Sequence, residues 1–575
     1  MIFLLKLKSK IKIVLILILF SMVIKLYGQS NTIIVDKGKY IIDENLKMIV
    51  CNNNIDEINF LSHDSSLNII LDRNQFKFKI VPDELEYGEE YSVYFNSENY
   101  QLFFSELPII KIATNGIIQD EPKILGSLLL TDNESSVAIS SYCAIEIRGG
   151  SSQFYPKKSY DFELLLNQAG DKKNKISLLG MREDDDWLLL SMQNEPLRLR
   201  NVVSHILWRE IHQPYYVEEV SSGIRMEYIE LAINDEYMGL YALSEQIDRK
   251  QLQLVKADSV VRGELYKGIN GGEVSTFDSL VSYDNKERIW SDFEMKYPKE
   301  DELTDWSNIY NFVDFVINAD DVTFENEITK EFRINNAIDY FIFMNLTYPT
   351  DNTGKNLYIA KYDIYEPYFY IPWDLDGTFG LNYKGNRVNI TDDTLSNGLY
   401  DRLIISNDII FNNGASNRWF DLRNNILKED NLTENILVKY NFLSENGNYI
   451  RESLKWGQES IDHSILEYTY EWLSKRIEFL DDYFRFHILG IKENTLSPEH
   501  LNIYPNPVTS TFKIIKTEEK SFNYYIFDIS GILLNQGFIS SKDSINVKHL
   551  SSGTYFLKII DNETRLLSNV RFIKR

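Results

Sequence analysis

Two aspartates one residue apart give the strongest chemical signal in the sequence, in the segment WDLDG at residues 373–377. In an extended strand alternate residues share a face, so Asp374 and Asp376 are expected to point the same way. Adjacent carboxylates repel each other unless a cation lies between them, and Mg²⁺ and Mn²⁺ prefer such hard oxygen ligands. The segment therefore predicts a site for Mg²⁺ or Mn²⁺. The alternative is a polar strand end in which Asp376 and Gly377 form a turn.

A second polar pair lies upstream, where Asp351 and Asn356 have the spacing D-x₄-N in the segment DNTGKN. In the catalytic loop of protein kinases, an Asp and an Asn have this spacing. The Asp accepts the hydroxyl proton of the substrate, and the Asn binds a metal. Asp, Asn, Thr and Gly also form loops, so a plain turn is the alternative. The pair gains weight because Asp374 follows Asp351 by 23 residues, across one expected β-hairpin (LYIAKYD and YFYIPWD).

A glycine-containing loop joins two expected strands within RGGSSQFYPKKSY, residues 148–160. Glycines let backbone N–H groups approach phosphate oxygens. Arg148, Lys157 and Lys158 bring positive charge to the same segment. The segment therefore predicts a phosphate-binding loop, with an ordinary hairpin carrying surface lysines as the alternative.

Histidine, cysteine and net charge exclude several classes of function. The seven histidines form no HxH or HExxH pattern, which disfavours a His-based zinc hydrolase. The two cysteines, Cys51 and Cys143, are too few for a Cys₄ zinc site. No GxSxG, Walker A or GxGxxG motif occurs, which disfavours lipases, P-loop NTPases and Rossmann enzymes. A formal net charge of −25 disfavours binding to nucleic acid, because phosphate contacts need clustered Lys and Arg.

The apolar patterns predict a mostly β front half and a mostly helical back half. Short runs rich in Ile, Val, Tyr and Phe indicate a small β domain over residues 29–105. Residues 106–260 are expected to be mainly β, with one helix at 197–211 and a hairpin at 228–246. Amphipathic spacing predicts three further helices, within residues 306–319, 337–348 and 465–484. The candidate catalytic residues fall near the junction of the two halves.

The two termini predict export. Residues 1–28 combine a lysine-rich start with a 12-residue apolar run at 13–24, which indicates a signal peptide and leaves no transmembrane helix in the mature chain. An uncleaved membrane anchor is the alternative. Export would permit a disulfide between Cys51 and Cys143 without requiring one. After an expected linker at 491–500, short β runs separated by turns predict a β-sandwich over residues 501–575.

The chemical motifs occur in the order found in the CotH-like kinase family, named for a spore-coat protein. The resemblance covers roughly residues 106–430 and rests on LPIIKI, IRGGSSQFYPKKSY, LRNVVSHILWREI, EYMGLYALSEQID, NLYIAKYD and IPWDLDGTFG. It implies an atypical protein-kinase-like, bilobal fold that transfers the γ-phosphoryl group of ATP to protein hydroxyls, with Mg²⁺ or Mn²⁺ as cofactor.

The resemblance also implies roles for the catalytic and metal-binding residues. Asp351 resembles the catalytic aspartate and Asn356 the metal-binding asparagine. Asp374, with Asp376 beside it, resembles the metal-binding aspartate of kinases.

On the nucleotide side, Lys157 or Lys158 resembles the phosphate-pairing lysine, and Arg148 belongs to the same loop. Glu245 resembles a residue of the nucleotide pocket. Glu195 is a departure, because the family often has Asp before the helix that begins LRN.

Residues 501–575 resemble the type A sorting domain of the type IX secretion system. The resemblance rests on YPNP (504–507), FDISG (527–531) and LSSGTYFLKI (550–559). It implies that the type IX secretion machinery is a partner and that the protein is secreted or displayed on the cell surface.

Together these observations predict an α+β protein in which an N-terminal β domain, a CotH-like kinase domain at residues 106–490 and a C-terminal sorting domain follow a signal peptide. The expected function is an exported, ATP-dependent protein kinase. One alternative is a kinase-like surface-binding protein without turnover. Another is glycan hydrolysis by paired carboxylates, in which the glycine loop and its lysines would have no role.

Overall fold

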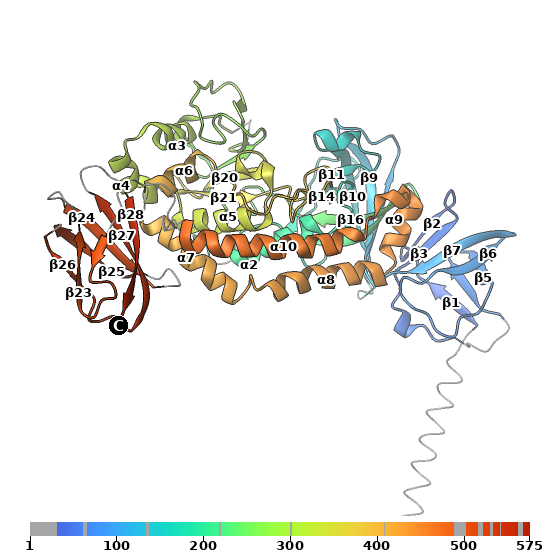
Figure 1. Ribbon diagram of the computed structural model, residues 1–575. Helices are drawn as coiled ribbons and strands as arrows, with labels where there is room; N and C mark the ends of the chain where they lie inside the picture. The colour runs from blue at the N-terminus through green and yellow to red at the C-terminus, as the bar shows by residue number, and fades with distance from the viewer. Residues whose placement is uncertain are drawn as a thin grey trace, which may run out of the picture. The chain divides into compact units, whose positions relative to one another are not determined.

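The computed structural model divides into two compact units (Figure 1). Unit 1 consists of Met1–Pro196, Arg225–Gln246 and Leu437–Asp462, and unit 2 consists of Leu197–Ile224, Ile247–Ile436 and His463–Arg575. The residues that the structure describes are 31–60, 66–133, 137–214, 216–217, 220–299, 302–406, 409–487, 502–515, 521–528, 533–540, 542–561 and 567–575. The expected signal peptide and linker lie outside them.

The N-terminal part of unit 1 is a seven-stranded sheet with strand order β1-β4-β5-β6-β7-β3-β2. Its strands are β1 (Thr32–Val35), β2 (Tyr40–Asp43), β3 (Met48–Cys51), β4 (Asn68–Leu71), β5 (Asn74–Phe78), β6 (Tyr91–Phe95) and β7 (Glu98–Phe104). Alternating burial along β1, β2 and β4 indicates that one face of each strand packs into a core. The predicted β-rich character of this region is confirmed.

A closed seven-stranded barrel follows, with order β10-β11-β14-β16-β15-β8-β9. Its strands are β8 (Ile109–Thr114), β9 (Ile124–Thr131), β10 (Ile139–Arg148), β11 (Ser159–Leu165), β14 (Asp186–Leu190), β15 (Met226–Ile233) and β16 (Glu236–Ser244). The barrel closes through parallel pairing of β8 with β15, whereas β15 and β16 form the predicted hairpin. Its interior is an apolar cluster that includes Phe162, Trp187 and Tyr241. Helix α9 (Asn448–Trp456) packs against β16 and completes unit 1.

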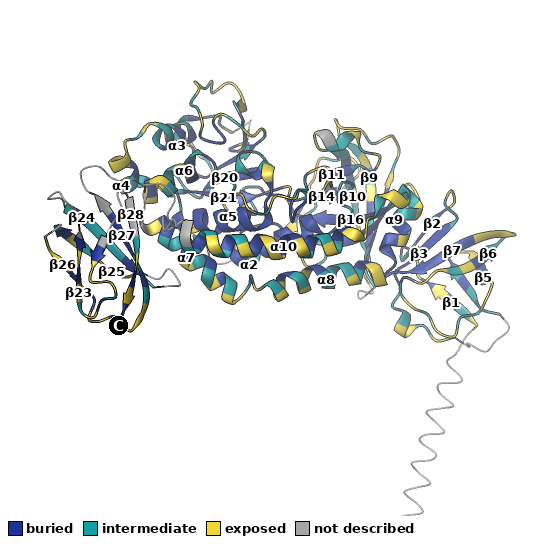
Figure 2. Ribbon diagram, in the orientation of Figure 1, coloured by how far each residue is buried: buried dark blue, intermediate teal, exposed yellow. Residues whose placement is uncertain are grey.

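Unit 2 is built around a five-stranded sheet with order β18-β19-β17-β20-β21. The strands are β17 (Glu264–Gly268), β18 (Ile289–Trp290), β19 (Phe293–Tyr297), β20 (Leu357–Lys361) and β21 (Tyr368–Pro372). Helix α5 (Ile334–Thr347) is buried along almost its whole length and contacts β21. Figure 2 shows this burial in dark blue. Apolar residues occur on every side of α5, as expected for a central helix, and its buried Asn336, Asp339 and Asn345 have hydrogen-bond partners.

The other α-helices among the described residues lie wholly or partly in unit 2. They are α2 (Arg200–Ile211), α3 (Ser307–Asn318), α4 (Asp321–Glu331), α6 (Gly398–Ile405), α7 (Ile409–Asn424), α8 (Glu429–Glu445) and α10 (Ser464–Asp482). Helices α2, α7 and α10 each contact α5. The predicted helices at 197–211, 306–319, 337–348 and 465–484 correspond to α2, α3, α5 and α10 and are confirmed.

The C-terminal residues of unit 2 form two small antiparallel sheets. One has the order β22-β23-β26 and the other β25-β24-β27-β28. Their strands are β22 (Asn502–Tyr504), β23 (Thr511–Ile515), β24 (Ser521–Phe527), β25 (Leu533–Ser540), β26 (Ser544–Asn546), β27 (Gly553–Asp561) and β28 (Leu567–Lys574). Residues of both sheets share one apolar cluster, which includes Phe512, Phe522 and Phe572.

Cys51 and Cys143 are both buried free thiols. They belong to separate hydrophobic clusters, one in the N-terminal sheet and one in the barrel. Burial raises the pKa of Cys143 to about 12 and that of Cys51 further, so both thiols are unreactive at neutral pH. The structure therefore does not contain the disulfide that export would permit. Among the described residues, no helix is long and apolar enough to cross a membrane.

Candidate functional site

The candidate metal ligands of unit 2 lie at the open end of the hairpin formed by β20 and β21. In this antiparallel pair Leu357 is opposite Pro372. Asn356 immediately precedes the first strand and Asp374 follows the second by two residues, so the pairing brings them to the same end. The backbone N–H of Trp373 donates to the carbonyl oxygen of Asn356 at 3.0 Å, which extends the pairing beyond the strands.

Asn352 holds the two segments together from beneath. It is buried, and its Nδ2 donates to the carbonyl oxygens of Asn356 at 2.6 Å and of Trp373 at 2.9 Å. Tyr340 of α5 donates through its hydroxyl to the carbonyl oxygen of Asn352 at 3.0 Å. A neutral amide thus ties the candidate catalytic loop to the candidate metal-binding turn.

The geometry of the WDLDG segment differs from the sequence-based expectation. Strand β21 ends at Pro372, and Asp374 has a left-handed backbone with φ of 55°. The prediction that Asp374 and Asp376 share a strand face is therefore wrong, and a turn follows Asp374 instead. Asp374 is exposed and Asp376 is half-buried. Asn356 also has a positive φ, of 54°. Such conformations cost energy outside glycine and cluster at functional sites.

One face of helix α2 fixes the backbone of this turn. The Nε of Arg200 donates to the carbonyl oxygen of Asp376 at 2.7 Å. The Oδ1 of Asn201 accepts the N–H of Leu375 at 3.2 Å. One turn further along, Ser204 and Thr378 share a hydrogen bond between their hydroxyls at 3.1 Å. Residues at i and i+4 lie on one helix face, so the spacing within α2 matches the span of the turn.

Asp351 lies in the short 3₁₀ helix η3 (Thr350–Thr353), directly before Asn352. Its carboxylate is 3.6 Å from the ammonium of Lys355, and both side chains are partly exposed, at 34% and 45%. Strand β17 closely approaches this loop, because a Cβ added at Gly268 would lie 2.0 Å from the carbonyl oxygen of Gly354. Only glycine fits at Gly268, and its carbonyl oxygen accepts the N–H of Asn356 at 3.2 Å.

His205 of α2 packs behind the turn. Its ring lies edge-on to Trp373 with centroids 6.3 Å apart. Neither ring nitrogen has a hydrogen-bond partner among the residues that the structure describes. Burial, with a smaller contribution from the charge of Arg209, lowers the pKa of His205 to about 3. The imidazole is therefore neutral at physiological pH.

In unit 1, the glycine loop connects β10 to β11. Arg148 ends β10 and pairs with Ser159, and Gly149 has φ of 111°, which favours glycine. The Nζ of Lys158 donates to the carbonyl oxygens of Gln153 at 2.6 Å and of Tyr155 at 2.5 Å. Lys158 therefore stabilises the loop from within.

Lys157 is not a surface residue, because its side chain is 0% exposed. Its Nζ donates to the carbonyl oxygen of Leu240 at 2.5 Å and to the two carboxylate oxygens of Glu452 at 2.8 and 3.0 Å. It also lies 4.7 Å from the ring centroid of Tyr241. The alternative of a hairpin with surface lysines is thus wrong for Lys157. Protein kinases also hold a phosphate-pairing lysine in an ion pair with a glutamate.

Glu245 is buried and accepts two backbone hydrogen bonds. Its carboxylate binds the N–H groups of Arg182 at 3.0 Å and of Arg225 at 2.9 Å. Glu195, where the family often has Asp, is also fully buried. In these surroundings Glu245 joins neighbouring segments of unit 1, and its role in nucleotide binding stays a prediction.

The donor set of unit 2 fits a hard divalent cation. Asn356, Asp374 and Asp376 offer amide and carboxylate oxygens, which are the ligands that Mg²⁺ takes in kinases. Elsewhere, Asp184, Asp185 and Asp186 are the one group of three His, Cys, Asp or Glu side chains within 4.8 Å of one another in the described part of the chain. Arg182 already pairs with Asp184 at 2.6 Å.

Sequence reasoning missed three residues that the structure connects with the site. Asn352 lies inside the DNTGKN segment. Its position directly after Asp351 was the only sign in the sequence that it belongs to the site. Asn201 lies in the LRN motif of α2. Glu452 gave no local signal, because it lies 295 positions from its partner Lys157.

Two family models match the chain. Residues 145–486 match the model described as CotH kinase protein, and residues 502–574 match the model described as secretion system C-terminal sorting domain. No curated protein matches the chain. The first match covers more than half of the sequence, so the chain belongs to the CotH kinase protein family. The second confirms the resemblance to a sorting domain, which supports secretion or display at the cell surface.

Proposed function

We propose that this protein is an exported, kinase-like phosphotransferase that moves the γ-phosphoryl group of ATP to hydroxyl groups of secreted or surface proteins. The observation that carries the proposal is the open end of the β20–β21 hairpin, where Asn352 ties the segment of Asp351 and Asn356 to that of Asp374. A D-x₄-N loop next to a second aspartate is the arrangement that protein kinases use for acceptor and metal. A bilobal kinase-like core and a β-sandwich sorting domain belong to the same proposal.

In this proposal Asn356 and Asp374 hold Mg²⁺ or Mn²⁺, with Asp376 next to them. The metal would neutralise charge on the phosphates of ATP. The contacts from α2 and Asn352 hold the backbone of the turn, so that the exposed carboxylate of Asp374 is already oriented for a ligand. Such preorganisation avoids an ordering cost at each binding event.

Asp351 would act on the acceptor hydroxyl. The hydroxyl proton passes to its carboxylate while the hydroxyl oxygen bonds to the γ-phosphorus, and the bond from that phosphorus to the bridging oxygen of ADP breaks. The exposure of Asp351 suits a residue that meets a protein substrate.

The phosphate-binding roles fall to unit 1. Backbone N–H groups of the loop that begins at Gly149, together with Arg148 and Lys158, would bind phosphate oxygens. The Lys157–Glu452 pair supports a kinase-like role for Lys157. We further propose that the type IX secretion machinery exports the protein after recognition of its sorting domain.

A second candidate function is a kinase-like surface protein that binds without turnover. The enclosure of Lys157 favours it, since three acceptor oxygens already surround the ammonium. A phosphate oxygen could reach the ammonium of Lys157 only by displacing one of these three oxygens.

Matched variants of the metal-binding and base residues test the proposal. Residues 29–500, incubated with labelled ATP and Mn²⁺, should place label on themselves or on an added acceptor protein. Mg²⁺–ATP should raise the melting temperature of the wild type, because a ligand stabilises the state that it binds by about 2.7 kcal/mol at a hundred times Kd. Asp374→Ala should lose most of this rise. An unchanged rise would mean that the metal binds at other residues.

Asp351→Asn should bind nucleotide normally and transfer little phosphate. Removal of a general base slows turnover by about 10²–10⁴, and affinity depends little on an interaction made mainly in the transition state. Calorimetry and transfer assays on the same preparations separate the two effects. A wild-type rate of phosphate transfer in Asp351→Asn would show that this residue takes no part in the mechanism. Absence of transfer by the wild type with every acceptor would favour the binding-protein alternative.

A further inference from the structure

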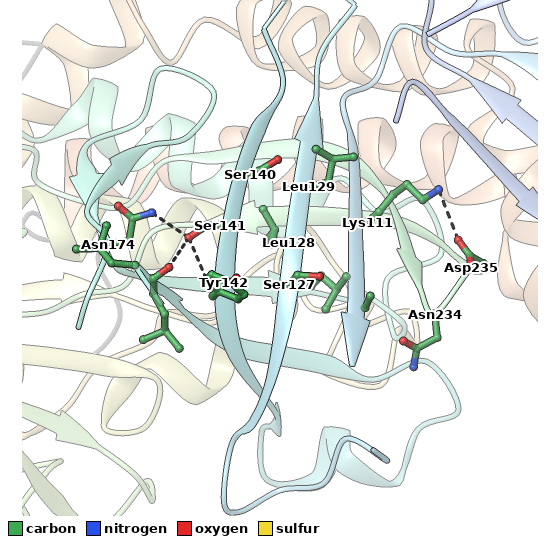
Figure 3. A pocket seen from close by; sticks show the side chains of 14 residues that line it. Lys111, Ser127, Leu128, Leu129, Ser140, Ser141, Tyr142, Asn174, Asn234 and Asp235 are labelled. Atoms are coloured by element: carbon green, nitrogen blue, oxygen red, sulfur yellow. Dashed lines mark hydrogen bonds and ion pairs between the residues drawn. The ribbon is translucent and has the colours of Figure 1, made fainter. Parts of the chain in front are cut away.

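A trough of about 650 Å³ lies in unit 1 on the outer side of the barrel (Figure 3). Its floor is formed by β8, β9 and β10, and its two sides carry Asn174 and the turn residues Asn234 and Asp235. The volume falls in the range of about 300–1,000 Å³ that is typical of ligand sites. The trough lies at the opposite end of β10 from the glycine loop, since Tyr142 and Arg148 are six residues, or about 20 Å, apart along the strand.

Strand register explains which side chains the floor presents. Tyr142 is opposite Ser127, and Ser140 is opposite Leu129, so these four side chains share the outer face while Leu128 and Cys143 point into the core. Tyr142 is 42% exposed, and Ser127 and Ser140 are also exposed. The floor therefore presents one large aromatic ring flanked by hydroxyl groups.

Hydrogen bonds fix the amides on both sides of the trough. Asn174 donates through Nδ2 to the Oγ of Ser141 at 2.9 Å, which uses one of the four hydrogen-bonding positions of its amide. Asn234 accepts the backbone N–H of Thr114 at 2.8 Å and donates to its hydroxyl at 3.2 Å. The amides are therefore oriented before any ligand arrives, which lowers the cost of binding.

The charges and the closed barrel narrow the class of ligand. Lys111 and Asp235 form an ion pair at 3.5 Å, so the charged lining residues balance each other and an anionic ligand has no excess of positive charge to bind. Strands β8, β9 and β10 are paired on both sides, so an extended peptide cannot add to a free strand edge. What fits is a neutral ligand that offers many hydroxyl groups and an apolar face to stack on Tyr142.

We propose that this trough is a carbohydrate-binding site for a chain of neutral sugar residues. A sugar ring stacks on Tyr142 with its apolar face, while the serine hydroxyls and the two amides bind its hydroxyl groups. The proposal does not rest on phosphotransfer, because no residue of the trough takes part in the proposed reaction. Its role is to hold the exported protein on a glycan-bearing surface.

Calorimetry with the secreted full-length chain tests this proposal without ATP. The probes are the neutral hexasaccharides of glucose, xylose, mannose and N-acetylglucosamine, in β-linked form, and maltohexaose. At least one should bind the wild type, and Tyr142→Ala should weaken that binding about tenfold or more. Tyr142→Phe keeps the ring and should stay within about threefold. Asn174→Ala should weaken binding by about three- to tenfold.

Tyr365→Ala is the matched control, because Tyr365 is 92% exposed and lies in unit 2. It should bind as the wild type does, and all four variants should keep the wild-type melting temperature within about 2 °C. If no probe binds the wild type, the ligand class is wrong. If Tyr142→Ala and Asn174→Ala both bind like the wild type, the sugar binds elsewhere and the trough is not the site.

Discussion

The two units hold their functional charges in opposite ways. In unit 1, Lys157 and Glu452 are fully buried and bind each other, and Glu230 and Arg451 form a second fully buried ion pair. In unit 2, the carboxylates of Asp351 and Asp374 reach solvent, while the buried side chains of Asn352 and Arg200 bind backbone carbonyl oxygens of the same segments. Unit 1 therefore uses charge to hold its own elements together. At its candidate site, unit 2 fixes the backbone with two amides and one guanidinium and leaves the carboxylates of Asp351 and Asp374 where a cation or a substrate can reach them.

Buried and exposed ion pairs also differ in how much they contribute to the free energy of unfolding. Removal of one partner from a buried pair leaves an unpaired charge in a medium of low polarity and destabilises a protein by about 3–5 kcal/mol. An exposed pair contributes about 0–1 kcal/mol. Substitutions of the same type should therefore have very different effects in the two units.

The largest effect is expected for Glu452→Gln. The ammonium of Lys157 would stay buried without a counter-charge, and the free energy of unfolding should fall by at least about 3 kcal/mol. Urea unfolding followed by circular dichroism measures this. Glu327→Gln is the control, because its pair with Lys330 is exposed on α4, and its effect should stay within about 1 kcal/mol.

A second variant keeps this prediction testable if Glu452→Gln does not fold. Lys157→Met combined with Glu452→Gln removes the unpaired charge and should recover most of the lost stability, because apolar replacements of buried ion pairs are often tolerated. A double variant no more stable than Glu452→Gln would show that packing of the two side chains, not charge, stabilises unit 1.

A smaller effect is expected for Asn352→Ala, which tests whether neutral groups hold the site of unit 2. The carbonyl oxygens of Asn356 and Trp373 lose a shared donor, so the free energy of unfolding should fall by about 2 kcal/mol. The stabilisation by Mg²⁺–ATP should fall as well. The exposed Asn386→Ala should change neither quantity. An Asn352→Ala protein with intact metal stabilisation would show that the loop does not need this amide.

The neutral state of His205 predicts acid sensitivity of unit 2. The folded pKa is about 3 and the ordinary value is about 6.5, so below pH 6.5 the unfolded chain takes up a proton that the folded chain does not. Stability from this group is complete above pH 6.5 and is lost as the pH falls, by about 1.4 kcal/mol per pH unit. The wild type should lose stability more steeply than His205→Gln between pH 6.5 and pH 4.5. If the free energies of unfolding of the two proteins, measured in urea, fall equally with pH, the imidazole takes up its proton in the folded state.

The smallest effect is expected for Lys355→Met. Its pair with Asp351 is long and partly exposed, so the free energy of unfolding should stay within about 0.5 kcal/mol of the wild type. A loss of more than about 1.5 kcal/mol would mean that unit 2, like unit 1, relies on its ion pairs for stability. Thermal unfolding of both proteins at the same ionic strength makes the comparison.

Local patterns predicted the elements of the fold better than the assembly of the site. The periodicity of α2, α3, α5 and α10 and the alternation of the β15–β16 hairpin depend on near neighbours, and they are confirmed. The hairpin that brings Asn356 to Asp374 was also visible as two strands. The direction of Asp374 was not, because Asp adopts a left-handed backbone only occasionally, and here contacts from α2 and Asn352 hold the backbone on both sides of it.

Pairing between distant segments left no signal in the sequence. Closure of the barrel depends on β8 lying parallel to β15, more than 100 residues further along the chain. Lys157 looks like a surface residue next to Lys158 until Glu452 is placed beside it. A polar residue in an amphipathic helix such as α9 normally faces solvent, so the buried position of Glu452 follows only from the packing of α9 on β16.

The three-segment construction of unit 1 also sets the order in which the protein can fold. A chain that emerges from the ribosome with its N-terminus first exposes Lys157 some 295 residues before Glu452 is made. Until α9 arrives, Lys157, in the loop between β10 and β11, lacks the carboxylate that it binds in the folded protein. Contacts of such long sequence separation slow folding. A nascent chain that stops before residue 437 should therefore remain open and bound to chaperones, and a protein destined for export gains time in which it is still unfolded.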